Sequence, residues 1–160
     1  MLRPLPIPAS LGLPIQSRVF LSEMPGRRQE IIKDMDAINI EGIDHVLCLL
    51  SHGEVSSREY FEFINRGYLK ANFHHCPLNS ACRADQKPAL TAALEPLIEN
   101  LRNGESVMIH CQFGEVRTGC AAAALLILLG LDFDEALSAV RCAGSDPESV
   151  DEAPLLRAYV

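Results

Sequence analysis

Two short apolar runs constrain the fold of this chain more than any other feature. One run is His45-Val-Leu-Cys-Leu-Leu50 and the other is Ser106-Val-Met-Ile-His110. A strand with one face in water alternates apolar and polar residues, whereas a parallel strand covered by helices on both faces is apolar throughout. Both runs have the length of a strand. They therefore predict buried strands of a mostly parallel sheet.

Segments with helical spacing lie between and after these runs. In 28–40, for example, Ile31, Met35 and Ile38 recur at intervals of three and four residues. Strands that alternate with such helices predict an α/β fold with a central, mostly parallel sheet flanked by helices. We expect further strands at 18–21 and 71–78, and further helices at 57–66, 88–102, 118–129, 133–142 and 151–159.

Composition limits the chain to one domain and excludes several classes of function. The 160 residues are 48% hydrophobic and 22% charged, which suffices for one ordinary core. The net charge of −7 disfavours nucleic-acid binding. The longest apolar run, 119–131, is shorter than the roughly 20 residues that a membrane-spanning helix needs. We expect no nucleic-acid or membrane partner, and a monomer is the working expectation for an oligomeric state that the sequence leaves open.

The N-terminal segment and the cysteines indicate the surroundings in which the chain works. Four prolines (Pro4, Pro6, Pro8 and Pro14) interrupt any apolar region of a signal peptide. We therefore expect an extended N-terminal strap over 1–17, a single domain over 18–160 and a cytoplasmic location. No Cys-x-x-Cys pair occurs, and no set of cysteine and histidine has zinc-site spacing. Free thiols and no metal site are the expectation.

The segment 107–119 carries the chemistry. It places Cys111 at the end of a buried strand, continues with a turn that contains Gly114, and sets Arg117 and Thr118 where a helix begins. Backbone N–H groups of such a turn form a nest for a phosphate, and an arginine fork grips two phosphate oxygens. The same positive field favours a thiolate, which is a nucleophile.

The pattern His110-Cys111-x5-Arg117-Thr118-Gly119 resembles the signature loop of the cysteine-dependent phosphatases, the tyrosine and dual-specificity superfamily. Segments 20–26, 42–46, 51–54 and 73–78 look like those of its kinase-associated phosphatase subgroup. The resemblance implies a dual-specificity-phosphatase-like fold. It also implies hydrolysis of phosphate monoesters, on phosphorylated proteins or small molecules, without a metal or organic cofactor. Activity on phosphotyrosine is implied, and activity on phosphoserine and phosphothreonine stays open.

The resemblance also implies a role for individual residues. Cys111 would attack phosphorus to form a phosphocysteine, and Arg117 would hold the equatorial oxygens in the transition state. Thr118 would donate a hydrogen bond to the sulfur as it leaves, and His110 would orient the loop from behind. Backbone amides would complete the phosphate cradle, at Gln112, Phe113, Gly114, Glu115, Val116 and Arg117. Glu115 disfavours polyphosphorylated substrates such as phosphoinositides, because it puts a negative charge near the polyanion.

The general acid is harder to assign than the nucleophile. The family's aspartate position corresponds to Ser80 here, and the only aspartate in this loop is Asp85. A helix that begins about one turn later keeps Asp85 in register, so we expect Asp85 to protonate the leaving oxygen. The alternative is that Asp85 only caps the helix near Pro88. Glu54, in a loop that resembles one at the family's active-site rim, is the next carboxylate to consider.

A phospho-binding adaptor and other thiol enzymes are the alternatives to a phosphatase. Without an acid, the chain would be a pseudophosphatase or adaptor that holds a phosphorylated partner. Sulfurtransferases and arsenate reductases lack the Arg-Thr-Gly helix start or place their loop elsewhere. A protective disulfide from Cys111 to Cys48 or Cys120, which the resemblance to some relatives implies, is a further hypothesis.

Overall fold

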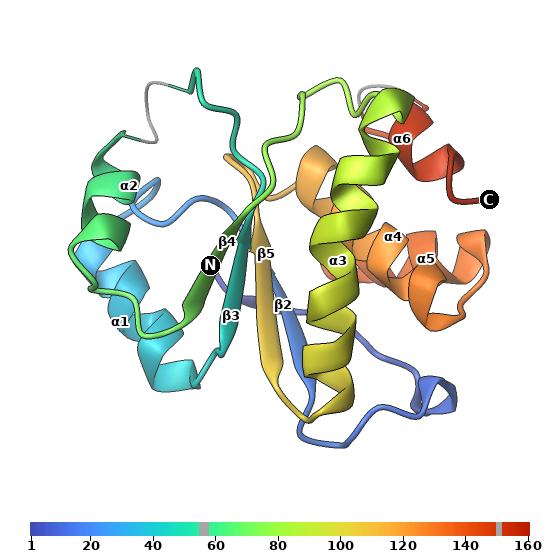
Figure 1. Ribbon diagram of the computed structural model, residues 1–160, viewed down its shortest axis with the longest axis horizontal. Helices are drawn as coiled ribbons and strands as arrows, with labels where there is room; N and C mark the ends of the chain where they lie inside the picture. The colour runs from blue at the N-terminus through green and yellow to red at the C-terminus, as the bar shows by residue number, and fades with distance from the viewer. Residues whose placement is uncertain (55–57, 150–151) are drawn as a thin grey trace.

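The computed structural model describes residues 1–54, 58–149 and 152–160. A five-stranded sheet in the order β1-β2-β5-β3-β4 forms its centre (Figure 1). All neighbouring strands are parallel except the pair β1–β2, which is antiparallel. The predicted α/β fold with a mostly parallel sheet is confirmed. The strands are β1 (Arg3–Pro4), β2 (Arg18–Ser22), β3 (His45–Cys48), β4 (Asn72–His75) and β5 (Ser106–His110).

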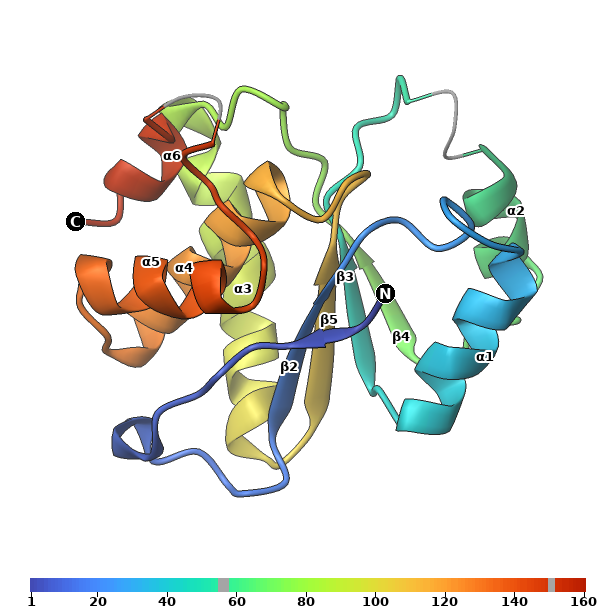
Figure 2. The same ribbon diagram turned by 180° about the vertical axis from the view of Figure 1, so that it is seen from behind.

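Helices cover both faces of this sheet, as Figures 1 and 2 show from opposite sides. One face carries α1 (Ile31–Glu41) and α2 (Arg58–Asn65). The other carries α3 (Lys87–Arg102), α4 (Val116–Leu129), α5 (Phe133–Cys142) and α6 (Pro154–Arg157). Two 3-10 helices, η1 (Ala9–Leu11) and η3 (Ala84–Gln86), lie in loops.

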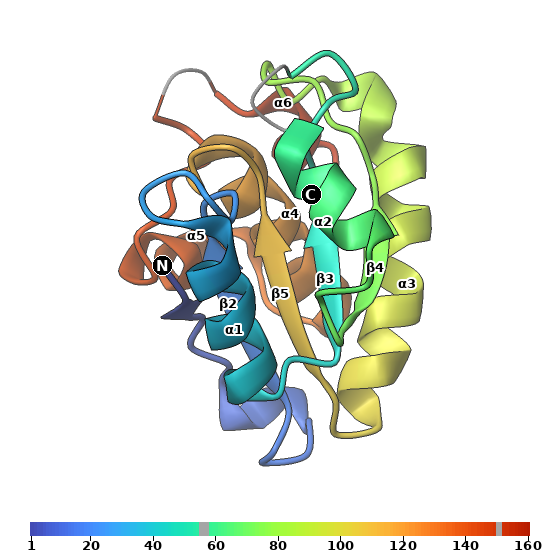
Figure 3. The same cartoon turned by 90° about the vertical axis from the view of Figure 1, so that its left-hand side faces the viewer.

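The two apolar runs form the central pair of strands. In β3 and β5 every residue is buried, and the strands pair in parallel with Leu47 opposite Ile109. Their side chains pack against helices on both faces, which is why neither run has a polar alternation. The side view of Figure 3 shows both strands ending at the same edge of the sheet, and the loop after β5 lies at that edge.

The helix expected over 151–159 is much shorter in the structure. Residue 151 lies outside the described residues, and α6 spans only Pro154–Arg157. Proline is tolerated in the first turn of a helix but not in its interior, and the preceding Ala153 adopts a left-handed conformation with φ 48°. The helix therefore begins at Pro154. Residue 57, where a helix was expected to start, also lies outside the described residues.

The N-terminal strap contains structure that the sequence did not reveal. Arg3 pairs with Leu21 and Pro4 with Phe20 in the short strand β1, and Leu5 N donates to Val19 O at 2.8 Å. Proline is acceptable here because β1 is an edge strand, where one side of the backbone needs no partner. Two residues are too few to produce a pattern in the sequence, so the strap expected over 1–17 gave no sign of this strand.

Candidate active site

The loop after β5 brings the predicted phosphate-binding residues together. Cys111 follows the last residue of β5, and α4 begins at Val116, two residues earlier than expected. Arg117 and Thr118 therefore lie in the first turn of α4. The Gly119 amide donates to Glu115 O at 2.9 Å, which closes that turn. The geometry is a strand, a tight turn and a helix N-terminus, the arrangement that suits anion binding.

Gly114 makes the tight turn possible. Its φ is +72°, in the left-handed region that glycine adopts without strain. A Cβ atom here would lie 2.7 Å from backbone atoms of Ser22 and Glu23, at the end of β2. The loop therefore presses directly against the neighbouring strand. Only glycine meets both requirements.

The sulfur of Cys111 receives two hydrogen bonds. Thr118 Oγ1 donates to Sγ at 3.0 Å, and the Gly114 amide donates at 3.3 Å. The residue is 3% exposed. Two donors therefore converge on one buried sulfur and fix its position.

Arg117 is buried beside the sulfur and has a carboxylate partner. It is 6% exposed, its Nη1 donates to Leu49 O at 3.4 Å, and its Nη2 lies 2.6 Å from Glu54 Oε1. Leu49 follows β3, and Glu54 lies five residues further on in the loop before α2. The ion pair compensates the buried guanidinium. Glu54, which the sequence left as an open candidate, is thus part of the site.

His110 supports the loop from behind, as the resemblance implied. It is fully buried, with Nδ1 3.2 Å from Cys111 O and Nε2 2.8 Å from the Tyr60 hydroxyl. A carbonyl can only accept, so Nδ1 carries the proton and Nε2 accepts from Tyr60. Burial lowers the pKa of His110 to about 4 and keeps the ring neutral. Tyr60 is 50 residues away in α2, and no motif in the sequence pointed to it.

A pocket of about 390 Å³ opens over this loop. Its lining includes the aromatic Phe113, which is 54% exposed, and the acidic Glu115. Gly114 faces away from the pocket toward β2. The lining residues are Glu54, Ser80, Cys111, Gln112, Phe113, Glu115, Val116 and Arg117.

Asp85 lies outside the lining of this pocket. It is exposed in η3, and its two carboxylate oxygens accept from Arg83 at 3.2 and 2.8 Å. Ser80, from the same loop, does line the pocket. The helix α3 begins at Lys87 with Gln86 as its N-cap, so Asp85 does not occupy the capping position. Its role as general acid stays a prediction.

The cysteines considered for a disulfide are free thiols in the structure. Cys48 lies opposite His110 in the β3–β5 pairing, and burial raises its pKa to about 12. Cys120 exchanges a hydrogen bond with Cys82, and both are buried. A disulfide from either residue to Cys111 stays a prediction.

No group of three or more histidine, cysteine, aspartate or glutamate side chains within 1–54, 58–149 and 152–160 is placed to hold a metal ion. Across the same ranges, no helix has both the length and the apolar character needed to span a membrane.

A thiol and an arginine that converge on one phosphate-sized nest are the apparatus of enzymes that hydrolyse phosphate esters through cysteine. The family PTP-SAK, described as "Swiss Army Knife protein, DSP-PTPase phosphatase domain", matches residues 18–158, and the chain belongs to this family. The protein is a cysteine-dependent phosphatase of the protein-tyrosine and dual-specificity class.

Solved structures agree with this assignment. A structure of kinase-associated phosphatase superposes with a TM-score of 0.83 at 19% identity, covering 99% of this chain and 93% of that one. The phosphatase Tk-PTP in a mutant form gives 0.67 at 26% identity, with coverages of 88% and 86%. Human DUSP28 gives 0.66 at 14% identity, with 88% and 90%. Comparison with curated proteins gave no match.

Proposed function

We propose that the protein removes phosphate from phosphorylated proteins and small phosphomonoesters through a phosphocysteine on Cys111. One observation carries the proposal. The Cys111 sulfur lines the pocket and accepts hydrogen bonds from Thr118 Oγ1 and the Gly114 amide. A cysteine that only fills a core has no use for two donors, whereas a nucleophile does.

Arg117 would bind substrate by exchanging one anion for another. In the structure its guanidinium holds the Glu54 carboxylate at 2.6 Å. A phosphate dianion carries more charge and offers two oxygens that match the planar fork, so it displaces Glu54. The equatorial oxygens then stay on Arg117 and the loop amides as charge develops in the transition state.

Thr118 and His110 would serve different halves of the reaction. In the first step sulfur bonds to phosphorus and the ester oxygen leaves with a proton from the general acid. In the second step water bonds to phosphorus, the S–P bond breaks, and the acid takes back a proton. Thr118 stabilises the departing thiolate through its 3.0 Å hydrogen bond. His110, held by Tyr60, keeps the Cys111 carbonyl turned away from the phosphate.

Asp85 is our first candidate for the general acid, and Glu54 is the second. Asp85 belongs to the loop that contributes Ser80 to the pocket, but it must leave Arg83 to reach a leaving group. Glu54 already lines the pocket, yet its carboxylate is paired with Arg117 and must leave the guanidinium to reach a leaving group. A phosphate that displaces Glu54 from Arg117 removes that obstacle.

The rim of the pocket favours a phosphoaryl group such as phosphotyrosine. Phe113 is 54% exposed and lines the pocket, so an aromatic leaving group can pack against it. Glu115 and the net charge of −7 disfavour polyphosphorylated ligands. Phosphoserine and phosphothreonine remain candidate substrates whose use depends on the acid.

A cytoplasmic location is part of the proposal. The chemistry needs Cys111 as a thiol, and reducing compartments keep thiols in that state. The five other cysteines are likewise free. Immunolocalisation, or fractionation of cells that express the protein, tests this point.

The test is hydrolysis of p-nitrophenyl phosphate and of a phosphoserine peptide, with reductant and a metal chelator. The variants are Cys111→Ser, Asp85→Asn and Glu54→Gln, with Cys142→Ser as the matched control because Cys142 is exposed. We expect turnover by the wild type and the control, and none by Cys111→Ser. Activity that survives in Cys111→Ser would overturn the proposal.

The two acid candidates are separated by the leaving group. p-Nitrophenolate leaves without a proton, whereas the serine oxygen must be protonated as it leaves. Loss of the general acid therefore lowers the rate on the serine ester by about 10² to 10⁴-fold and the rate on the aryl ester much less. If Asp85→Asn shows this contrast, Asp85 is the acid. If Glu54→Gln shows it instead, the acid is Glu54.

A phospho-binding adaptor is the second candidate function. It is favoured by the position of Asp85, which is paired with Arg83 outside the pocket. An adaptor would show no turnover by the wild type and would still bind vanadate or tungstate, with loss of binding in Arg117→Met.

A further inference from the structure

The carbonyl of Gly114 is held by two side chains from opposite ends of the chain. Arg3 Nη2 donates to it at 2.6 Å, and Ser145 Oγ also donates at 2.6 Å. Arg3 lies in β1, and Ser145 lies just after α5. Gly114 itself sits in the middle of the catalytic loop. A single carbonyl that receives two such donors is fixed in direction.

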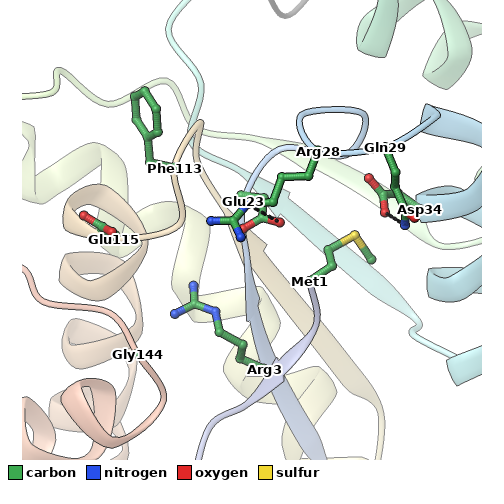
Figure 4. Close-up of a pocket in the computed structure, with 9 residues that line it drawn as sticks. All are labelled: Met1, Arg3, Glu23, Arg28, Gln29, Asp34, Phe113, Glu115 and Gly144. Atoms are coloured by element: carbon green, nitrogen blue, oxygen red, sulfur yellow. Dashed lines mark hydrogen bonds and ion pairs between the residues drawn. The ribbon is translucent and has the colours of Figure 1, made fainter.

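Arg3 reaches this carbonyl because it is wedged among three segments. Its Nη1 donates to Ala143 O at 2.9 Å, and β1 pairs it with Leu21. A Cβ atom on Gly144 would lie 2.7 Å from Nη1, so the glycine leaves room for the guanidinium. Figure 4 shows the Arg3 side chain extending from β1 into a pocket that it shares with Glu23 and Gly144.

The direction of this carbonyl determines the direction of the next amide. In a trans peptide the C=O and the following N–H point to opposite sides. Neither Arg3 nor Ser145 lines the catalytic pocket, so the Gly114 carbonyl points away from it. The Glu115 N–H, on the opposite side of that peptide, is therefore directed toward the pocket that Glu115 lines.

Reversing this peptide would reverse its electrostatic contribution. A carbonyl oxygen would then face the bound phosphate in place of an N–H donor, which repels an anion. The charge of Arg3 acts in the same direction as its hydrogen bond. Burial lowers the pKa of Arg3, and Glu23, Cys111 and Glu115 partly offset that effect. A cation near the loop also favours a bound anion such as phosphate.

We propose that Arg3 is a positioning residue of the phosphatase, which together with Ser145 fixes the Gly114–Glu115 peptide so that the Glu115 N–H faces the phosphate. The inference rests on the proposed role of 111–117 as the phosphate cradle. It makes the N-terminal strand part of the active site, although the family match begins only at residue 18. Arg3 touches the loop and not the reacting atoms.

The test compares Arg3→Met, Arg3→Lys, Ser145→Ala and the double variant Arg3→Met/Ser145→Ala with the wild type. Arg18→Met is the matched control. Arg18 lies on the neighbouring strand β2 and forms an exposed ion pair with Glu41. The readouts are kcat and KM for p-nitrophenyl phosphate and the affinity for vanadate, which resembles the transition state, and for phosphate, which resembles the ground state.

We expect Arg3→Met to lower kcat by about tenfold to a hundredfold, less than the roughly 10² to 10³-fold typical of deleting an oxyanion donor, because the amide is misdirected and not lost. KM should change little. Vanadate affinity should fall with kcat, and phosphate affinity should fall less. The double variant should lose more than the product of the single losses, because in each single variant the remaining donor still holds the carbonyl in part. Lysine at position 3 reaches only one of the two carbonyls that Arg3 contacts. The kcat of Arg3→Lys should therefore lie between those of the wild type and Arg3→Met.

Several results would overturn the proposal. One is that Arg3→Met and Arg18→Met change kcat and vanadate affinity equally. Another is strict multiplicativity in the double variant. If Arg3→Met does not fold, Ser145→Ala and Arg3→Lys carry the same comparison. If the wild type does not turn over substrate, the proposed function fails and the positioning role does not, because tungstate binding to the same variants still reports the direction of the amide.

Discussion

The catalytic loop 111–115 and the loop 79–86 line the same pocket and are built in opposite ways. The catalytic loop is tied to distant parts of the chain, by Arg3, by Ser145 and by Met24, whose amide donates to Gln112 O at 3.1 Å. The loop 79–86 is bonded mainly to itself, and its carboxylate is exposed. Cys82 attaches it to the rest of the chain, because its side chain is buried in the core and its O accepts from Leu155 N at 2.8 Å.

This contrast separates the two halves of the reaction. The half that holds the phosphate is assembled before substrate arrives, with donors that need no rearrangement. The half that protonates the leaving group rests on a side chain that is engaged elsewhere. Changes in the catalytic loop should therefore have large effects on all substrates, and changes in 79–86 should have effects that depend on the leaving group.

Gly114→Ala should break the rigid half most severely. The substitution puts a Cβ atom 2.7 Å from the backbone of β2 at a φ of +72°. We expect a loss of about 1–3 kcal/mol in stability and at least a hundredfold loss in kcat/KM. Gly42→Ala has a φ of +75° and nothing within 4 Å of the added atom, so it should lose stability alone. Urea unfolding and steady-state kinetics on both variants check this, and equal kinetics in the two would contradict it.

Arg117→Lys should weaken the same half with less structural damage. Lysine keeps the charge but cannot grip two oxygens at once. We expect kcat to fall by roughly 10² to 10³-fold with a smaller change in KM, because the lost contact is strongest in the transition state. Arg83→Lys, in the other loop, is the matched control. A larger effect of Arg117→Lys on KM than on kcat would mean that Arg117 contributes mainly to ground-state binding.

The stability of the fold should also depend on pH through His110. Its pKa is about 4 in the fold and near 6.5 when exposed, so the unfolded chain binds a proton between these values and the folded chain does not. Protonation of His110 in the unfolded chain therefore lowers the free energy of unfolding as the pH falls from 6.5 toward 4, by up to about 3 kcal/mol. Above pH 6.5 this effect is absent. Urea unfolding of the wild type and His110→Gln from pH 7.5 to 4.5 measures it. Parallel pH profiles would exclude this contribution.

Arg83→Ala, in the loop 79–86, should have the smallest effect of these substitutions. The Arg83–Asp85 pair is exposed on both sides, and such pairs contribute roughly 0–1 kcal/mol. We expect no measurable change in thermal stability. If Asp85 is the acid, its release should raise turnover of the phosphoserine peptide by a small factor and leave the aryl ester unchanged. A fall in serine-ester turnover would show instead that Arg83 helps to present Asp85.

The sequence was informative where chemistry and chain proximity coincide. Cys111, Arg117 and Thr118 lie within eight positions of one another, so a local pattern was enough to find them. The strands β3 and β5 were also predictable, because burial on both faces leaves a continuous apolar run. The position of His110 behind the loop came from the resemblance to the phosphatase family.

Residues that reach the site from elsewhere left no such pattern. Tyr60, Arg3 and Ser145 act through single hydrogen bonds made possible only by the folded chain. A tyrosine in an amphipathic helix or an arginine among prolines is unremarkable in a sequence. Asp85 illustrates the opposite failure, since chain position alone cannot say whether an exposed carboxylate turns toward a pocket or toward a neighbouring arginine.

The ion pair between Arg117 and Glu54 has a consequence for how the protein folds. A guanidinium that is 6% exposed would be costly to bury without a counter-charge. The Glu54 carboxylate at 2.6 Å supplies that charge from within the chain. Folding of the site therefore needs no bound anion to neutralise Arg117.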